Sequence, residues 1–449
     1  MTVRTIAELK TNMPIGVAGG ISAADMHDLV DTVESRTSWK ISRKTANYTA
    51  TLGDHQTVLA FNSATPVTLT LPNTLPEAWT CKIIQMGAGQ VTVSVAGSPP
   101  RAYDFHNKTA GQYAVALVTI ESNGTGTSAV AVLEGTTAGD SLLMGVNLSA
   151  AEIGSTVPGV YNADYTFPTS GELDYYKSKG LTLIRLPFLW ERVQLTLNGA
   201  LDATYLGHIK TFVNAAASKG VKVILDVHNY ARYNGNLLGS AQVPITAFRD
   251  LWVKLATEFV GNAGVYAYDI MNEPHGLSST SIWPTAAQSA VDGIRTVDTT
   301  TTIIVSGDEW SGAWSWMTYN SGLSISDPSN KIIYQAHCYF DPNSSGLYAE
   351  TYDQAGGTPT LGVQRVQPFL NWLAANNRKG FVGEYGVPDN DARWLVMLDN
   401  FLAALVANNV SGTYFTGGPW WDASTPIAVE PVNGVDRPQM ATLAKYPSQ

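Results

Sequence analysis

The chain has 449 residues, which is too long for one ordinary domain and indicates two or three. Hydrophobic residues make up 45% and charged residues only 14%, a balance that excludes a disordered chain, and the formal net charge of −10 argues against a nucleic-acid-binding surface. The two cysteines, Cys81 and Cys338, exclude a disulfide scaffold and are too few for a cysteine-based metal site.

The amino terminus, MTVRTIAELK, lacks the basic region and apolar run of a secretory signal. No run of about 18 apolar residues marks a membrane span, so we expect no membrane partner. The protein is expected to stay inside a cell or to leave it by a route other than a cleaved signal. Residues 1–47 are predicted to be helical, because ISAADMHDLVDTVES offers Ser22 as an N-cap and a helical stripe of apolar residues.

Residues 48–137 change character and are predicted to form a β-rich accessory domain resembling a β-sandwich. Short β-branched runs such as VTLTL, VTVSV and AVAVLEG alternate with Gly, Pro, Asn and Ser turn signals. A carbohydrate-binding module is a lower-ranked alternative, since it needs exposed coplanar aromatic residues. The region holds few of them, Trp79, Tyr103, Phe105 and Tyr113 among them.

Residues 138–449, after a linker at 135–141, show eight short apolar runs separated mostly by helix-like stretches that end in glycine. The runs are 142–149, 181–187, 221–228, 265–273, 301–307, 331–339, 379–386 and 412–418. Strands that alternate with helices indicate parallel strands buried on both faces, and eight such units predict a (β/α)8 TIM barrel of the α/β class. An open doubly wound sheet is less favoured, because no glycine-rich dinucleotide loop follows the first strand.

Polar and aromatic residues stand where these runs close, and in a barrel those ends converge on one face. They are Arg185, His228, Asn272, Glu273, His337, Tyr339, Glu384, Tyr385, Trp420 and Trp421. Each of them has an ordinary structural explanation when taken singly. Their joint position at strand ends predicts a functional site.

Two glutamates in this set carry the predicted chemistry. In YAYDIMNEPHG, Pro274 stops the strand and presents Glu273 at its carboxyl end, and Glu384 follows on the seventh strand. Two carboxylates that face each other across a cleft are the arrangement that cleaves a glycosidic bond, one as acid and one as nucleophile or base. The many aromatic residues, 12 Trp and 20 Tyr, suit the apolar faces of sugar rings.

Residues 142–449 resemble glycoside hydrolase family five, in particular its endo-β-1,4-glucanases. The motifs GVNLSAAEIG, IRLPFLWERVQ, LDVHNYARYNG, DIMNEPHG, YQAHCYFDPNSSG, FVGEYG and GGPWW carry the resemblance in order along the whole barrel. The resemblance implies retaining hydrolysis of a β-glucan with Glu273 as general acid/base and Glu384 as nucleophile. Retention predicts carboxyl groups roughly 5–5.5 Å apart. No metal or other cofactor is required.

The same resemblance implies roles for the neighbouring residues. Asn272 would hydrogen-bond the sugar 2-hydroxyl, and Tyr339 would position Glu384. Arg185, His228 and His337 would hold the carboxylates and the sugar. Trp420, with Trp421, would stack under that sugar.

Further aromatic residues after the strands suggest an elongated cleft that favours internal cutting of a polymer. We expect some of them to bind additional glucosyl units and about half to be packing residues. The candidates are Trp310, Trp314, Trp316, Trp190, Tyr230 and Tyr233.

The amino-terminal stretch TVRTIAELKTNMP followed by GGISAADMHDLVDTVES resembles the amino termini of phage tail and baseplate-associated proteins. This resemblance implies attachment to a virion and homotrimer formation through residues 1–135, with the enzyme acting as an exopolysaccharide depolymerase. Two alternatives stay open: a β-mannanase or other β-glycan hydrolase of the same fold, and a non-catalytic polysaccharide-binding tail protein.

Overall fold

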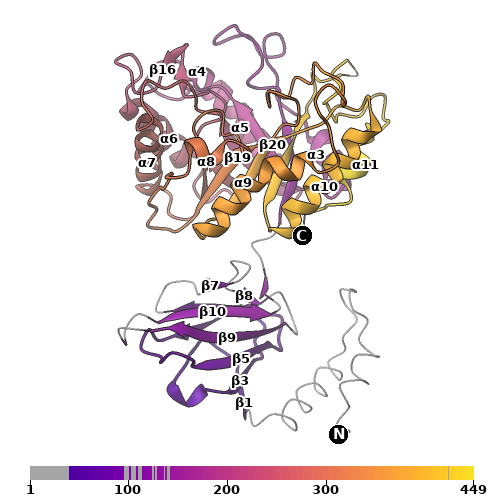
Figure 1. Cartoon of the computed structure of the whole chain (residues 1–449). Helices are drawn as coiled ribbons and strands as arrows, with labels where there is room; N and C mark the ends of the chain where they lie inside the picture. Colours follow the sequence, from indigo (N-terminus) through magenta and orange to yellow (C-terminus); the bar gives the residue numbers. More distant parts are fainter. Residues whose placement is uncertain are drawn as a thin grey trace. The chain divides into compact units, whose positions relative to one another are not determined.

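A computed structural model of the chain describes residues 40–95, 101–102, 108–109, 114–123, 126, 129–135, 137–138, 142–422 and 424–448. The chain divides into two compact units, Met1–Ser141 and Leu142–Gln449. Figure 1 shows the strands of the first unit and the helix-wrapped strands of the second. Within the described residues no helix has both the length and the apolar character needed to cross a membrane.

The first unit contains two β-sheets that share one core. The six-stranded sheet has the order β1 (Lys40–Lys44), β3 (Thr57–Phe61), β5 (Thr80–Gln85), β9 (Val115–Ser122), β10 (Val130–Gly135) and β7 (Arg101–Ala102). The five-stranded sheet has the order β11 (Thr137–Ala138), β8 (Lys108–Thr109), β6 (Val91–Val95), β4 (Val67–Leu71) and β2 (Tyr48–Thr49). A single turn of 3-10 helix, η1 (Leu52–Asp54), follows β2.

The two-layer arrangement follows from the period of two in the strand sequences. In β4, Val67, Leu69 and Leu71 are buried while the residues between them are half-exposed, and they pack with Leu59 and Phe61 of the other sheet. A β-rich region is thus present as predicted. Strands β1 to β6 alternate between the two sheets, and each pairs in parallel with the neighbouring strand of its own sheet. The alternation of apolar and polar residues within a strand does not specify this pairing.

Two expectations for the first unit need correction. The predicted helical segment 1–47 ends in a strand, β1, and its residues 1–39 lie outside the described residues. Trp79 is 2% exposed and belongs to the shared core, so it offers no platform for a sugar ring. The other aromatic candidates, Tyr103, Phe105 and Tyr113, lie outside the described residues.

The second unit is a closed barrel of eight parallel strands, as predicted, with helices around it (Figure 1). Its strands are β12 (Met144–Leu148), β13 (Leu183–Phe188), β14 (Lys222–Val227), β17 (Val265–Asp269), β18 (Thr302–Ser306), β19 (Ile332–His337), β20 (Gly380–Tyr385) and β21 (Ser411–Gly417). A two-stranded hairpin, β15 (Arg232–Tyr233) and β16 (Asn236–Leu237), follows β14. The chain therefore has the (β/α)8 TIM-barrel fold.

Helices lie between successive strands of the barrel, and one more follows the last strand. They are α3 (Ser170–Ser178), α4 (Trp190–Val193), α5 (Ala203–Ser218), α6 (Ile245–Phe259), α7 (Ile282–Arg295), α8 (Trp316–Tyr319), α9 (Leu361–Ala375), α10 (Ala392–Ala407) and α11 (Pro438–Leu443). Local sequence fixes several of their starts. Asp202 and Asp391 accept hydrogen bonds from the first turns of α5 and α10, which satisfies backbone donors that have no partner within the helix.

The barrel interior is layered, and the layers position the site. Five buried apolar residues from alternating strand positions form one cluster: Leu183, Ile224, Ala267, Ile304 and Phe381. Two residues further along the same strands stand Arg185, Asp226, Asp269, Ser306 and Gly383. Because strand side chains repeat every two residues, this second set lies on the same inward face, one layer closer to the carboxyl ends. The apolar layer therefore supports a polar one.

Candidate active site

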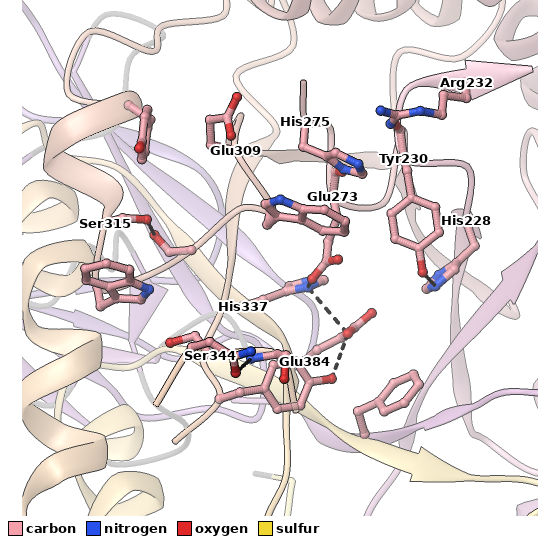
Figure 2. Close-up of a pocket in the computed structure, with 18 residues that line it drawn as sticks. His228, Tyr230, Arg232, Glu273, His275, Glu309, Ser315, His337, Ser344 and Glu384 are labelled. Carbon is pink, nitrogen blue, oxygen red and sulfur yellow. Dashed lines mark hydrogen bonds and ion pairs between the residues drawn. The ribbon is translucent and has the colours of Figure 1, made fainter. Parts of the chain in front are cut away.

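A cleft of about 800 Å³ lies at the carboxyl ends of the barrel strands. Figure 2 shows Glu273, His337 and Glu384 side by side in it, with His228 and Tyr230 on one flank. Eight residues that the sequence predicted for the site line this cleft: His228, Tyr230, Glu273, Trp310, Trp314, His337, Tyr339 and Glu384. They come from five different strand ends.

The two glutamates meet at His337. His337 and Glu384 are register partners on the neighbouring strands β19 and β20, so their side chains start next to each other. His337 Nδ1 lies 2.6 Å from Glu273 Oε1 and 3.5 Å from Glu384 Oε2. An oxygen of each carboxylate and a nitrogen of the imidazole lie within 4.8 Å of one another.

Glu384 is held as an anion. Its Oε1 accepts a hydrogen bond from Arg185 Nη1 at 2.9 Å, and its Oε2 accepts one from the Tyr339 hydroxyl at 2.8 Å. Burial acts to raise the pKa of this carboxyl, but interactions with His337, Arg185, His228 and the Tyr339 hydroxyl outweigh burial and lower the pKa below its ordinary value.

Glu273 has the opposite electrostatic character. Burial raises the pKa of its carboxyl above the ordinary value, and the charge of Glu384 raises it further, while His337 acts against both. The strand β17 ends at Asp269, so Glu273 stands on the turn that follows, with φ of +42° before Pro274. The two carboxyls thus have pKa values displaced in opposite directions.

Arg185 is fully buried and organises a polar layer beneath the two glutamates. Its guanidinium lies 2.8 Å from Asp269 Oδ2 and 3.0 Å from Asp226 Oδ2. It also donates to the side-chain oxygens of Asn147 at 2.9 Å and Asn272 at 2.7 Å. Burial raises the pKa of Asp269 to about 7, with Arg185 acting against it and Asp226 adding to it.

Sequence reasoning did not single out three members of this layer, Asn147, Asp226 and Asp269. A signal for them exists: a charged or amide residue inside an apolar strand, two or three positions before a strand-end polar residue, as in LDVH and YDIMNE. The period of two then places Asp226 on the same face as His228.

His228 and Asn272 support each other at the edge of the layer. His228 Nδ1 lies 2.7 Å from Asp226 Oδ2, and its Nε2 lies 3.1 Å from the Tyr230 hydroxyl and 3.2 Å from Asn272 Nδ2. Asn272 is fully buried between Arg185 and His228. The amide is therefore oriented by contacts from both sides.

The aromatic candidates separate into cleft-lining and packing residues. Trp310 and Trp314 line the cleft and are 50% and 57% exposed. The ring of Trp310 stacks on His275, with centroids 3.4 Å apart and planes within 10°. By contrast Trp190, Tyr233 and Trp316 are buried in the barrel core, so they are packing residues that cannot contact a bound sugar.

Trp420 and Trp421 have different surroundings. Trp421 donates its Nε1–H to the Ser149 carbonyl at 2.9 Å and lines a second cavity, of about 240 Å³, that shares Tyr339 and Phe415 with the cleft. Trp420 is 41% exposed. Phe415, which no sequence motif singled out, lies in β21 and lines the main cleft.

A metal could in principle use the same atoms as the hydrolytic chemistry. Among the described residues, the group of potential ligands that lies close enough consists of Glu273, His337 and Glu384. Carboxylate and imidazole ligands suit several divalent ions. A cation bound there would cover both carboxylates, whereas their opposite pKa displacements fit acid–base chemistry by the carboxyls themselves.

Comparisons with known proteins give cellulases and endoglucanases. The cellulase family, glycosyl hydrolase family 5, matches residues 144–422. Endo-beta-1,4-glucanase B of Emericella nidulans is 33% identical over 309 residues, which span 67% of this chain and 90% of that protein. An endoglucanase from Pseudomonas stutzeri, solved with cellobiose, is 44% identical with a TM-score of 0.65, covering 68% of this chain and 92% of the other. An endo-beta-1,4-glucanase from Xanthomonas axonopodis pv. citri is 38% identical with a TM-score of 0.64, covering 68% and 98%.

Proposed function

This chain belongs to glycosyl hydrolase family 5, the cellulase family, and from that premise we propose that it is a retaining endo-β-1,4-glucanase. One observation carries the proposal. Glu273 and Glu384 bring carboxylate oxygens within 4.8 Å of each other at the floor of an open cleft, and their pKa values are displaced in opposite directions. The chain is a glycoside hydrolase, and these two residues are its proposed catalytic pair.

In the first step Glu384 attacks the anomeric carbon of the bound glucosyl unit. Arg185 and the Tyr339 hydroxyl keep Glu384 ionised for this attack. Glu273, whose pKa is raised, protonates the leaving oxygen as the glycosidic bond breaks. A covalent glycosyl-enzyme ester and a shortened glucan result.

In the second step Glu273, now a carboxylate, takes a proton from water. The hydroxide attacks the anomeric carbon, and the ester bond to Glu384 breaks with overall retention of configuration. The spacing supports this double displacement, because inverting enzymes separate their carboxyl groups by about 6.5–9.5 Å to admit a water molecule. An oxygen of Glu273 lies within 4.8 Å of an oxygen of Glu384, which is below that range.

The neighbouring residues orient the sugar and the catalytic pair. We assign His228, which lines the cleft, and Asn272, which is buried behind it, to the unit at the cut; Asp226 fixes His228 and Arg185 fixes Asn272. An amide held from both sides loses little entropy when it meets a sugar hydroxyl. Trp420, with Trp421, is assigned to stack under this same sugar.

The cleft supports internal cutting of a polymer. Tyr230, Trp310 and Trp314 extend the lining away from the two glutamates, and stacking on aromatic faces binds further pyranose rings. The endo-β-1,4-glucanase activity that its relatives are named for is the one we assign. A β-mannanase would use the same catalytic pair, and a panel of cellulose derivatives, β-glucan, mannan and xyloglucan distinguishes the two.

The decisive experiment compares reducing ends released from carboxymethyl-cellulose by the wild type, Glu384→Gln and Glu172→Gln. We expect wild-type activity, a loss of several orders of magnitude in Glu384→Gln, and full activity in Glu172→Gln, which changes an equally buried carboxyl on α3. Equal activity of wild type and Glu384→Gln would remove Glu384 from its role and exclude the mechanism.

Stereochemistry and cofactor use are checked separately. Proton NMR of the first products from cellotetraose should show the β-anomer, as retention requires, and an initial α-anomer would establish inversion instead. A chelator should leave activity unchanged, because the two carboxylates need no metal.

We also propose that the chain acts outside the cell as a tail-associated depolymerase that forms homotrimers through residues 1–135. The support is the resemblance of TVRTIAELKTNMP and GGISAADMHDLVDTVES to phage tail proteins. Light scattering of the full chain should give three times 48.1 kDa. A monomer at micromolar concentration would contradict the trimer, and absence of the chain from purified virions would contradict the attachment.

A further inference from the structure

A second cavity adjoins the active site, and the proposed reaction does not use it. Its volume is about 240 Å³, and it shares Tyr339, Ser345 and Phe415 with the main cleft. The Tyr339 hydroxyl donates to Glu384 Oε2 at 2.8 Å, so the side chain that contacts the proposed nucleophile also forms part of the cavity wall. A group in this cavity can therefore belong to the same molecule that Glu384 attacks.

One wall of the cavity is the loop after β19, which packs on Tyr339. Gly346 in this loop has φ of +75°, and a Cβ on it would lie 2.8 Å from the Tyr339 ring, so the close approach requires glycine. Asp341, which is fully buried, accepts hydrogen bonds from the Gly346 backbone N–H at 3.0 Å and from Ser345 Oγ at 2.7 Å. The protein's own contacts therefore hold this wall in place.

A second wall is aromatic. The rings of Phe415 and Trp421 have centroids 5.9 Å apart and planes at 78° to each other. Trp421 donates its Nε1–H to the Ser149 carbonyl at 2.9 Å, which orients the indole. Both side chains are half-buried, and such aromatic surfaces suit the apolar faces of sugar rings. Side chains that are already ordered lose little entropy when a ligand binds.

The size and chemistry of the lining select the class of ligand. A volume of 240 Å³ is the share of about eight water molecules in the liquid, which is enough for one sugar ring. Pro388, Pro426 and Ile427 supply apolar contacts, and Thr425 offers a hydroxyl that can donate or accept. The described residues that line the cavity include no charged side chain. An acidic group would therefore lose its hydration without gaining a charged partner, so a neutral ligand is favoured.

Leu347 lies at the open rim of this cavity. Its side chain is 80% exposed, the highest value among the exposed large apolar side chains of the described residues. A single exposed leucine is ordinary on a protein surface. This one, however, lines a cavity that is continuous with the active site. A ligand in the cavity would cover Leu347, and the removal of apolar surface from water would favour binding.

We propose that this cavity binds a neutral sugar branch, such as a xylosyl residue, carried by the glucosyl unit at the cut. The enzyme then accepts branched β-1,4-glucans as well as plain cellulose. The inference rests on the proposed function, because it names a further substrate class for the same catalytic pair. The bonds made and broken by Glu273 and Glu384 are unchanged, and the branch adds binding contacts only.

Binding of a matched pair of oligosaccharides tests the cavity without any turnover. The ligands are cellotetraose and the same tetraose with xylosyl branches at O6 of its glucosyl units. Titration calorimetry uses the full chain with Glu384→Gln, so that neither ligand is cleaved. We expect the branched tetraose to bind about tenfold more tightly than cellotetraose.

Three variants in the Glu384→Gln background locate the contact. Thr425→Trp fills the cavity and should abolish the tenfold advantage, and Leu347→Ala should reduce it to about threefold. Leu195→Ala is the matched control, because Leu195 is also an exposed leucine, at 48%, but lines neither the cleft nor the cavity. It should keep the full advantage. All three variants should bind cellotetraose as the parent does.

Two outcomes of the titrations would overturn the proposal. Equal affinity of the parent for the two tetraoses would exclude a branch site, even if Thr425→Trp failed to fold. An advantage that both Thr425→Trp and Leu347→Ala retain would place the branch elsewhere.

The products of xyloglucan hydrolysis test the position of the branch. After borohydride reduction, mass spectrometry should find wild-type products whose terminal glucitol carries a xylosyl residue. Thr425→Trp should release these products about tenfold more slowly and should hydrolyse swollen cellulose at the wild-type rate. Products that end only in an unbranched glucitol would refute the assignment to the unit at the cut. Failure of the proposed function differs, since the wild type would then release no reducing ends from either polymer, while the titrations would still decide the branch site.

Discussion

Replacing Arg185 by methionine removes the guanidinium of the buried polar layer while keeping most of the side-chain volume. Arg185 is fully buried and lies within 3.0 Å of carboxylate oxygens of Asp226, Asp269 and Glu384. Without the guanidinium these three carboxyls lose the cation that they share, and Asp226 and Asp269 are fully buried. The pKa values of Asp269 and Glu384 should then rise, because Arg185 lowers both in the wild type.

The expected cost follows from these contacts. Breaking a buried ion pair by removing one partner costs about 3–5 kcal/mol, because the remaining charge is left uncompensated. Asp269, whose pKa is about 7, can take up a proton near neutrality and relieve part of the strain. We therefore expect a loss of about 3–5 kcal/mol in the free energy of unfolding at pH 8, which corresponds to a fall in Tm of about 5–10 °C.

The sign of the pH dependence is fixed by linkage. Arg185 lowers the pKa values of Asp269 and Glu384 in the wild type, so its removal raises the folded-state pKa of both carboxyls. Ionisation of such carboxyls costs stability above the unfolded pKa and costs nothing once both states are protonated. The loss should therefore be clearly smaller at pH 5 than at pH 8. The double variant Arg185→Met with Asp269→Asn, which deletes one of the stranded carboxyls, should recover part of the loss at pH 8.

Thermal and urea unfolding at pH 5 and pH 8 measure these quantities, and Arg192→Met is the matched control. Arg192 is equally buried but donates to backbone carbonyls, those of Pro158 and Ala151 among them. Its removal should cost stability by a similar amount at both pH values. A loss in Arg185→Met that is the same at pH 5 and pH 8, or an acid limb of kcat/KM that stays in place, would refute the electrostatic account.

Three further predictions concern other parts of the chain. Tyr339→Phe removes a hydrogen bond to the Glu384 anion, and hydrogen bonds to charged groups are worth about 1.5–3 kcal/mol. The acid limb of kcat/KM should therefore move up by about one pH unit, and kcat should fall at least tenfold. An unchanged limb would argue against the contact. Glu172→Gln should stabilise the fold by about 1–3 kcal/mol at pH 8 and hardly at pH 4. Burial raises the pKa of this carboxyl from 4.5 to about 7, so its ionisation in the folded state costs stability above pH 4.5. Equal urea midpoints of the variant and the wild type at pH 8 would contradict this. Trp310→Ala should raise KM for cellohexaose about tenfold and leave the hydrolysis of 2,4-dinitrophenyl β-cellobioside unchanged. The reason is that the Trp310 ring, which stacks on His275, can bind the additional sugar rings of long substrates only. A matching loss of activity on both substrates would assign the residue a structural role.

The sequence by itself determined the barrel and the identity of the residues that close its strands. Eight apolar runs alternating with helical stretches are a local signal, since burial on both faces demands continuous apolar sequence in each strand. Pro274 predicted a strand end close to Glu273, whereas the fourth barrel strand ends earlier, at Asp269, and Glu273 stands on the turn that follows. The motifs that resemble glycoside hydrolase family five added the roles of Glu273 and Glu384.

Only the tertiary structure decided which neighbours these residues have. Asp226, Asp269 and Gln335 come from three strands, and nothing in any one strand states that their side chains meet beneath the glutamates. The same holds for the aromatic residues: Trp190 and Trp310 both follow a strand, yet one is buried and the other is half-exposed in the cleft. A local pattern fixes which face a side chain points to, whereas burial and hydrogen bonding depend on residues that closure of the barrel brings from elsewhere in the chain.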